Sequence, residues 1–139
     1  MSVMHTTNYQ NTFIRLAADS PVAEAQVPPL KSSGQTAANI QYDLVQDHPY
    51  EYTSDDVAFE VYARKQALPA AERKEAREAF FSKGQPCMRA SPLAKRYGWG
   101  VHSDADGKIA LVPAGSAEYD TFAKRADLKQ LQAMRSKKA

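Results

Sequence analysis

Basic and polar side chains that suit an anionic partner are concentrated in the segment from residue 83 to residue 102. The stretch from Lys83 to Gly100 contains four basic residues and no acidic one. Ser91-Pro92 is typical of the start of a helix, where free backbone N–H groups attract anions. These features predict a ligand site for nucleic acid or for a phosphorylated small molecule, with Tyr97 able to stack on a base. The candidate ligand-binding residues are Lys83, Arg89, Ser91, Lys95, Arg96 and Tyr97.

The charge of the whole chain is distributed unevenly along the sequence. The formal net charge is only +2, yet residues 83–139 carry 11 basic and 5 acidic side chains, whereas residues 1–52 carry 2 and 5. Such a basic C-terminal region fits an anionic partner, and it also fits simple solvation of a charged surface. The basic residues of the last twelve positions, which could extend the same surface, are Lys129, Arg135, Lys137 and Lys138.

Two other function classes are compatible with the same sequence. Cys87 is the only cysteine, and a thiolate favoured by nearby Arg89 could act as a nucleophile with His102 as its base. No catalytic signature of a known cysteine enzyme surrounds Cys87, so we favour a non-enzymatic binding protein over this small enzyme. The other alternative is a protein-interaction or homo-oligomeric module, joined through the edges of a sheet.

The sequence favours neither a metal nor an organic cofactor. The histidines, His5, His48 and His102, do not have metal-ligand spacing with one another or with Cys87. The Asp-Ala-Asp-Gly sequence over 104–107 is typical of a hairpin turn, because a calcium loop in that register would lack key ligands. Glycine-rich dinucleotide and phosphate loops are missing from the sequence.

Length and composition predict one globular domain over residues 1–139, with a frayed basic tail over 135–139. The chain has 139 residues, of which 43% are hydrophobic and 24% charged. These values exclude collagen-like and fully disordered proteins. The first residues lack the features of a signal peptide, and no apolar stretch is long enough to span a bilayer. With a single cysteine, the sequence predicts a cytoplasmic protein without a membrane partner.

Five segments have clear secondary-structure signals. A strand is expected over 11–17, a helix over 37–47 with Thr36 as its N-cap, and a helix over 70–81. A short helix should follow Ser91-Pro92, and Ser116 should cap a helix over 117–125. A last short element is expected over 128–134.

Residues 57–63 and 99–112 are expected to complete the sheet. Thr53 and Asp56 could begin a helix, but apolar residues alternate over 57–63, which favours a strand. Residues 99–112 are typical of a hairpin, in which a loop over 103–107 would pair Val101 with Ile109. The resulting fold class is α+β, with a small, largely antiparallel sheet built from 11–17, 57–63 and 99–112 and with helices packed on it.

Several longer stretches resemble a family of short bacterial proteins of unknown function. The resemblance covers nearly the whole chain, and it implies a single compact bacterial domain. It carries no activity, cofactor or catalytic residue with it. The stretches that support it are His5-Thr6-Thr7-Asn8-Tyr9, Tyr52-Thr53-Ser54-Asp55-Asp56-Val57, Phe59-Glu60-Val61-Tyr62, Phe81-Ser82-Lys83-Gly84-Gln85-Pro86-Cys87, Arg89-Ala90-Ser91-Pro92-Leu93 and Lys95-Arg96-Tyr97-Gly98-Trp99-Gly100.

Overall fold

A four-stranded sheet forms the centre of the molecule. The computed structural model describes residues 4–32 and 34–136. The strands are β1 (Thr12–Arg15), β2 (Trp99–Ser103), β3 (Ile109–Pro113) and β4 (Lys129–Gln132), and they lie in the order β3-β2-β1-β4. Strand β2 is antiparallel to both β1 and β3, whereas β4 is parallel to β1. The sheet is therefore mixed, and the prediction of a largely antiparallel sheet is wrong in this respect.

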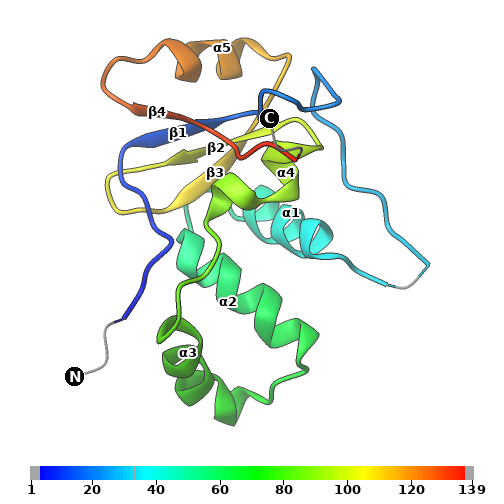
Figure 1. Cartoon of the computed structure of the whole chain (residues 1–139), viewed down its shortest axis with the longest axis vertical. Coiled ribbons are helices and arrows are strands. Elements are labelled where there is room, and N and C mark those ends of the chain that lie inside the picture. Colours follow the sequence, from blue (N-terminus) through cyan, green and yellow to red (C-terminus); the bar gives the residue numbers. More distant parts are fainter. Residues whose placement is uncertain (1–3, 33, 137–139) are drawn as a thin grey trace.

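Helices cover both faces of this sheet (Figure 1). Helix α5 (Ala117–Lys124) lies on one face, while α1 (Ala37–Asp47) and the short α4 (Pro92–Lys95) lie on the other. Helix α2 (Ser54–Lys65) packs on α1, and α3 (Arg73–Phe81) packs on α2 at the far end of the molecule. Two single-turn 3₁₀ helices, η1 (Ala70–Glu72) and η2 (Met88–Ala90), precede α3 and α4. The α+β class and the single compact domain are thereby confirmed.

Alternation along β1 divides the core between the two faces. Phe13 points to α5, where it contacts Tyr119 and Phe122, and Ile14 belongs to the larger cluster with α1 and α4. Both side chains are fully buried. This is the pattern expected of a strand with both faces covered.

The strand predicted over 57–63 is wrong, because these residues belong to α2. The Thr53 side chain accepts a hydrogen bond from the Asp56 N–H (3.1 Å), and the Asp56 carboxylate accepts one from the Thr53 N–H (3.0 Å). This capping box fixes the start of a helix. Val57 packs in the main core, whereas Phe59 and Ala63 pack toward α3. Burial on two sides of the helix produced the apparent alternation.

The hairpin of β2 and β3 forms as predicted, but its register differs by two residues. Val101 pairs with Leu111 and not with Ile109. The Asp104 N–H bonds to the Lys108 carbonyl (2.9 Å), and the Asp104 carboxylate also accepts from the Lys108 N–H. The loop of the hairpin is therefore shorter than the predicted loop over 103–107, and Gly107 lies in it with φ +80°. A shift of two residues leaves the same side chains on each face of the hairpin, and Trp99, Val101, Ile109 and Leu111 pack in the main core cluster.

The remaining element predictions agree with the structure. Helix α1 begins after Thr36 and α5 after Ser116, and each capping side chain accepts a backbone N–H. The helix predicted over 70–81 consists of η1 followed by α3, and the last predicted element is β4. In the predicted tail, the Ser136 N–H donates to Asp19, while residues 137–139 lie outside the described residues. None of the described helices is both long enough and apolar enough to cross a membrane.

Candidate functional site

Arg89 joins the two basic segments of the sequence. Its Nε donates a hydrogen bond to the Gln132 carbonyl (2.7 Å), and its own carbonyl accepts one from the Met134 N–H (2.8 Å). The segment that leads into α4 therefore runs beside the end of β4, an edge strand of the sheet. The sequence alone could not place these two segments on one surface.

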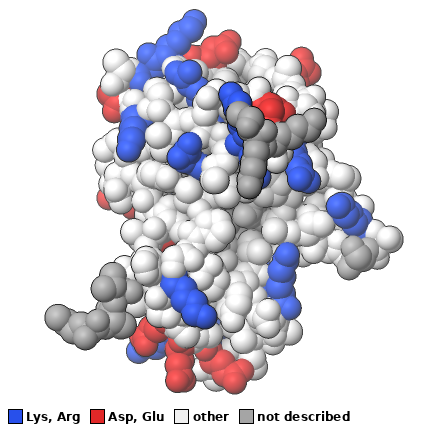
Figure 2. All heavy atoms as spheres, in the orientation of Figure 1, with Lys and Arg blue, Asp and Glu red and all other residues white. Residues whose placement is uncertain are grey.

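Among the described residues, the basic side chains of these two segments make no ion pair with an acidic residue. Leaving out Lys83, we call the other five residues the basic surface and define it by Arg89, Lys95, Arg96, Lys129 and Arg135. In residues 4–32 and 34–136, all five ion pairs involve other side chains. Figure 2 shows Lys and Arg spread over the upper half of the face that carries β4 and α4, with Asp and Glu gathered most densely at the lower end. Asp19, which accepts from Ser136, is an acidic residue next to this surface.

Ser91 has a structural role at the start of α4. Its hydroxyl donates to the Gln41 side chain (2.6 Å) and accepts from the Leu93 N–H (3.1 Å). Only 3% of Ser91 is exposed. Since both hydrogen bonds are internal and α4 spans four residues, Ser91 positions the segment that carries Lys95 and does not itself face a ligand.

Two other predicted ligand residues lie apart from the basic surface. Tyr97 is half-buried and packs against the main core, so its ring is a poor platform for a base. Lys83 is exposed and lines a shallow cleft with Tyr62 and Phe80 beside α3. Of the six predicted residues, the structure thus groups Arg89, Lys95 and Arg96.

Cys87 contacts a tyrosine from the N-terminal segment. Its Sγ lies 3.4 Å from the Tyr9 hydroxyl, and the thiol is half-buried. The hydrogen bond to Cys87 and burial raise the pKa of Tyr9, while the Arg89 guanidinium acts to lower it. The N-terminal segment is anchored nearby, because the His5 N–H donates to the Phe81 carbonyl (2.8 Å).

His102 lies beneath α5, in a different environment. Its Nδ1 is 2.7 Å from the Tyr50 hydroxyl, and its ring packs on Phe122 at 4.5 Å. Burial, followed by the Arg125 charge, lowers the pKa of His102, so the ring is neutral at physiological pH. No contact joins His102 to Cys87 among the described residues, so the structure does not assemble this pair.

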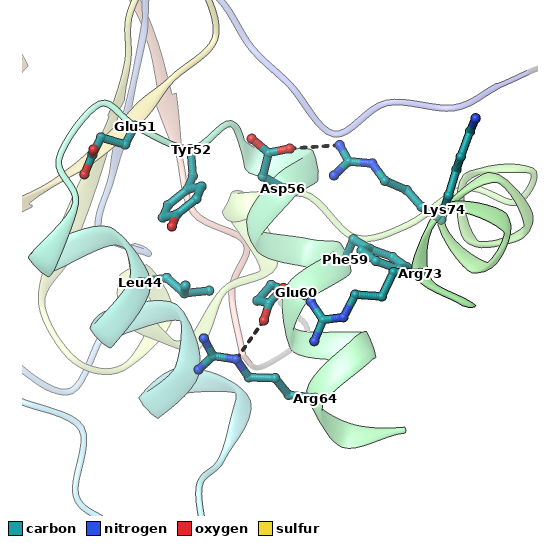
Figure 3. Close-up of a pocket in the computed structure, with 10 residues that line it drawn as sticks. Leu44, Glu51, Tyr52, Asp56, Phe59, Glu60, Arg64, Arg73 and Lys74 are labelled. Atoms are coloured by element: carbon teal, nitrogen blue, oxygen red, sulfur yellow. Dashed lines mark hydrogen bonds and ion pairs between the residues drawn. The ribbon is translucent and has the colours of Figure 1, made fainter. Parts of the chain in front are cut away.

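A charged cleft that the sequence analysis missed lies between α2 and α3 (Figure 3). It encloses about 600 Å³ and reaches α1 and the loop before α2. The cleft exists only because residues 57–63 belong to a helix, whereas the sequence predicts a strand there. The four-residue spacing of Glu60 and Arg64 was the available signal, since it places the pair on one helix face. The lining residues are Leu44, Glu51, Tyr52, Asp56, Phe59, Glu60, Arg64, Arg73, Lys74 and Arg77.

Metal-ligating side chains do not gather in the described part of the chain. Within residues 4–32 and 34–136, no three His, Cys, Asp or Glu side chains lie close enough to hold an ion.

Comparison of this chain with known proteins gives a match to one family. No curated protein and no solved structure matches it. The model of a family of unknown function, DUF6157, matches residues 4–139. The stretches singled out in the sequence all lie within this match, and the resemblance to an uncharacterised family is confirmed. The chain belongs to the DUF6157 family.

Proposed function

We propose that this protein binds a polyanion, with nucleic acid as the partner class, across the basic surface. The observation that carries the proposal is the pair of hydrogen bonds between Arg89 and residues 132–134. These bonds hold the segment before α4 beside the end of β4, so basic residues more than thirty positions apart in sequence belong to adjacent segments, which supports the proposal. Lys and Arg side chains without acidic partners are free to neutralise phosphates, and release of counterions then favours binding.

The shape of this region favours an extended partner over a small one. Small ligands need a concave site that covers most of their surface. Neither of the two clefts described above is lined by Arg89, Lys95 or Arg96. Because Tyr97 packs on the core, contacts to the phosphate backbone support the proposal better than base stacking does.

The test is a fluorescence anisotropy titration with labelled single- and double-stranded nucleic acid. The variant Lys95→Ala/Arg96→Ala/Arg135→Ala removes three charges whose side chains make no hydrogen bond or ion pair in the described structure. On double-stranded DNA, each lost phosphate contact lowers the slope of log K against log [salt] by about 0.9, so this slope should fall by about 2.7. Between about 50 and about 200 mM salt, the wild type should lose about 40-fold more affinity than the variant.

A matched variant separates this surface from net charge. The variant Lys31→Ala/Lys65→Ala/Lys108→Ala also removes three positive charges, but from exposed positions outside the basic surface. It should retain most of the salt slope of the wild type. The proposal is refuted if no binding occurs at low salt, or if the two triple variants lose affinity equally.

A further inference from the structure

The cleft between α2 and α3 has a volume typical of a small-molecule site. Its volume of about 600 Å³ falls within the range of roughly 300–1,000 Å³ that ligand pockets occupy. Its lining includes two apolar side chains that are nearly buried, Phe59 (4% exposed) and Leu44 (9% exposed). Tyr52 is half-buried at one side, and its hydroxyl has no hydrogen-bond partner among the described residues. Figure 3 shows this hydroxyl directed into the cleft toward Leu44.

The walls of the cleft carry more positive than negative charge. Glu60 of α2 accepts hydrogen bonds from Arg64 Nε (2.9 Å) and Arg73 Nη1 (2.7 Å). Asp56 pairs with Arg77 at 2.9 Å. Three guanidinium groups therefore share two carboxylates, because Glu51, the third acidic residue of the lining, pairs instead with His48. Figure 3 shows Glu51 turned away from this cluster.

The paired arginines keep donors for a further anion. The side chains of Arg64, Arg73 and Arg77 are 37–41% exposed, and each guanidinium has five N–H groups, of which these ion pairs use only some. Lys74 adds a fourth cation at the edge of the cleft and makes no ion pair in the described structure. Figure 3 shows its side chain extending away from Arg64 and Arg73. The excess of cations over facing carboxylates is the charge that an anionic group would neutralise.

We propose that this cleft binds a small organic anion, in which a carboxylate or phosphate group adjoins an apolar body. The anionic group would accept hydrogen bonds from the arginines of α2 and α3, with Lys74 adding to the attraction. The apolar body would lie on Phe59 and Leu44, with the Tyr52 hydroxyl as a polar contact at its edge. This site is separate from the basic surface, and it does not depend on the proposed binding of a polyanion.

A purely structural role for the ion pairs is the competing explanation. In that case, Glu60 and Asp56 would only hold α2 and α3 together through the arginines. Lys74 distinguishes the two explanations because its side chain makes no ion pair among the described residues and so does not help to hold α2 and α3 together. Reversing its charge should weaken ligand binding without unfolding the protein.

The experiment is an NMR titration of the full chain, with backbone amide shifts mapped on the structure. The probes are phenyl phosphate and benzoate, with inorganic phosphate and benzyl alcohol supplying the anion and the ring separately. For a probe of about ten non-hydrogen atoms, a dissociation constant on the order of 1 mM is expected. Saturating shifts should cluster in α2, α3 and the loop before α2, and each separated part should bind about tenfold more weakly.

Variants complete the test. Lys74→Glu should weaken binding of the tighter-binding organic anion, phenyl phosphate or benzoate, by about tenfold. Lys65→Glu makes the same charge change at the exposed end of α2 and should weaken binding of that anion by less than about twofold. Tyr52→Phe should weaken it severalfold through loss of the hydroxyl. Thermal unfolding of each variant shows that the fold is retained. The proposal is overturned if both organic anions fail to give saturating shifts, if the shifts map elsewhere, or if Lys74→Glu and Lys65→Glu bind alike.

Discussion

Gly98 links α4 to β2, and replacing it with alanine tests how tightly the basic surface is fixed to the sheet. Gly98 has φ +80°. A Cβ placed there would lie 2.5 Å from the Glu24 carbonyl oxygen and 2.9 Å from the Ala25 Cα. Both are backbone atoms, and hydrogen bonds hold their segment, because the Ala25 N–H donates to Ala114 and the Gln26 N–H to Tyr97. This neighbour cannot move aside as the end of a flexible side chain would.

Two costs add up in Gly98→Ala. The left-handed backbone costs a residue with a Cβ about 1–2 kcal/mol, and forcing a methyl group into a filled space costs about 1–3 kcal/mol. The expected loss of unfolding free energy is therefore about 2–5 kcal/mol. Gly107→Ala is the matched control, because Gly107 also has φ +80° but its Cβ would lie 3.4 Å from the nearest atom, the Tyr9 carbonyl oxygen. It should lose only about 1–2 kcal/mol.

Urea unfolding measured by circular dichroism gives both values, with equal m-values as the check on two-state behaviour. For a chain of this size, a loss of 1 kcal/mol lowers Tm by about 4 °C. The difference between the two variants isolates the contact with Glu24. If Gly98→Ala is no less stable than Gly107→Ala, residues 24–25 do not pack closely against Gly98 and the reasoning is refuted.

Three further predictions concern stability. Burial lowers the pKa of His102 below its usual 6.5, so the unfolded chain binds this proton at a higher pH than the folded chain does. The free energy of unfolding should therefore fall as the pH drops below about 6.5. His102→Gln should flatten that dependence in urea unfolding measured from about pH 5 to 8. Thr53→Ala removes the capping box of α2 and should cost about 1 kcal/mol in thermal unfolding, whereas exposed Thr121→Ala should cost less. Arg89→Lys keeps the charge but loses the hydrogen bond from Nε to the Gln132 carbonyl. Amide hydrogen exchange at residues 132–134 should accelerate and the free energy of unfolding should fall by about 1 kcal/mol, while polyanion binding is largely retained. Unchanged exchange would contradict the role of Arg89 as the link to β4.

Local signals in the sequence were sufficient for most of the helices and strands. Thr36, Ser91 and Ser116 were identified as N-caps, and each side chain accepts a backbone N–H in the structure. Capping depends on residues within three positions of one another, so the sequence contains the whole interaction. Local signals also predict the strand over 11–17 and the helix over 117–125, which the structure contains as β1 and α5.

Residues 53–63 show where local reasoning failed. The sequence contains two opposing signals here, because Thr53 and Asp56 can form a capping box while the apolar residues after them alternate as in a strand. Only tertiary packing explains that alternation, because α1 and α3 contact different sides of α2. A helix that is buried on two sides has a wide apolar surface, whose pattern can imitate a strand.

The two candidate sites depended on tertiary structure to different degrees. Composition and spacing identified the basic residues around Arg89, which are visible in the sequence as a run of charge. Their position beside β4 depends on contacts between residues 43 positions apart. The parallel pairing of β4 with β1 joins residues more than a hundred positions apart. The cleft between α2 and α3 needed both the correct helix and its docking. Secondary structure arises largely from neighbours along the chain, whereas a site arises from neighbours in space, and only the folded structure brings those neighbours together.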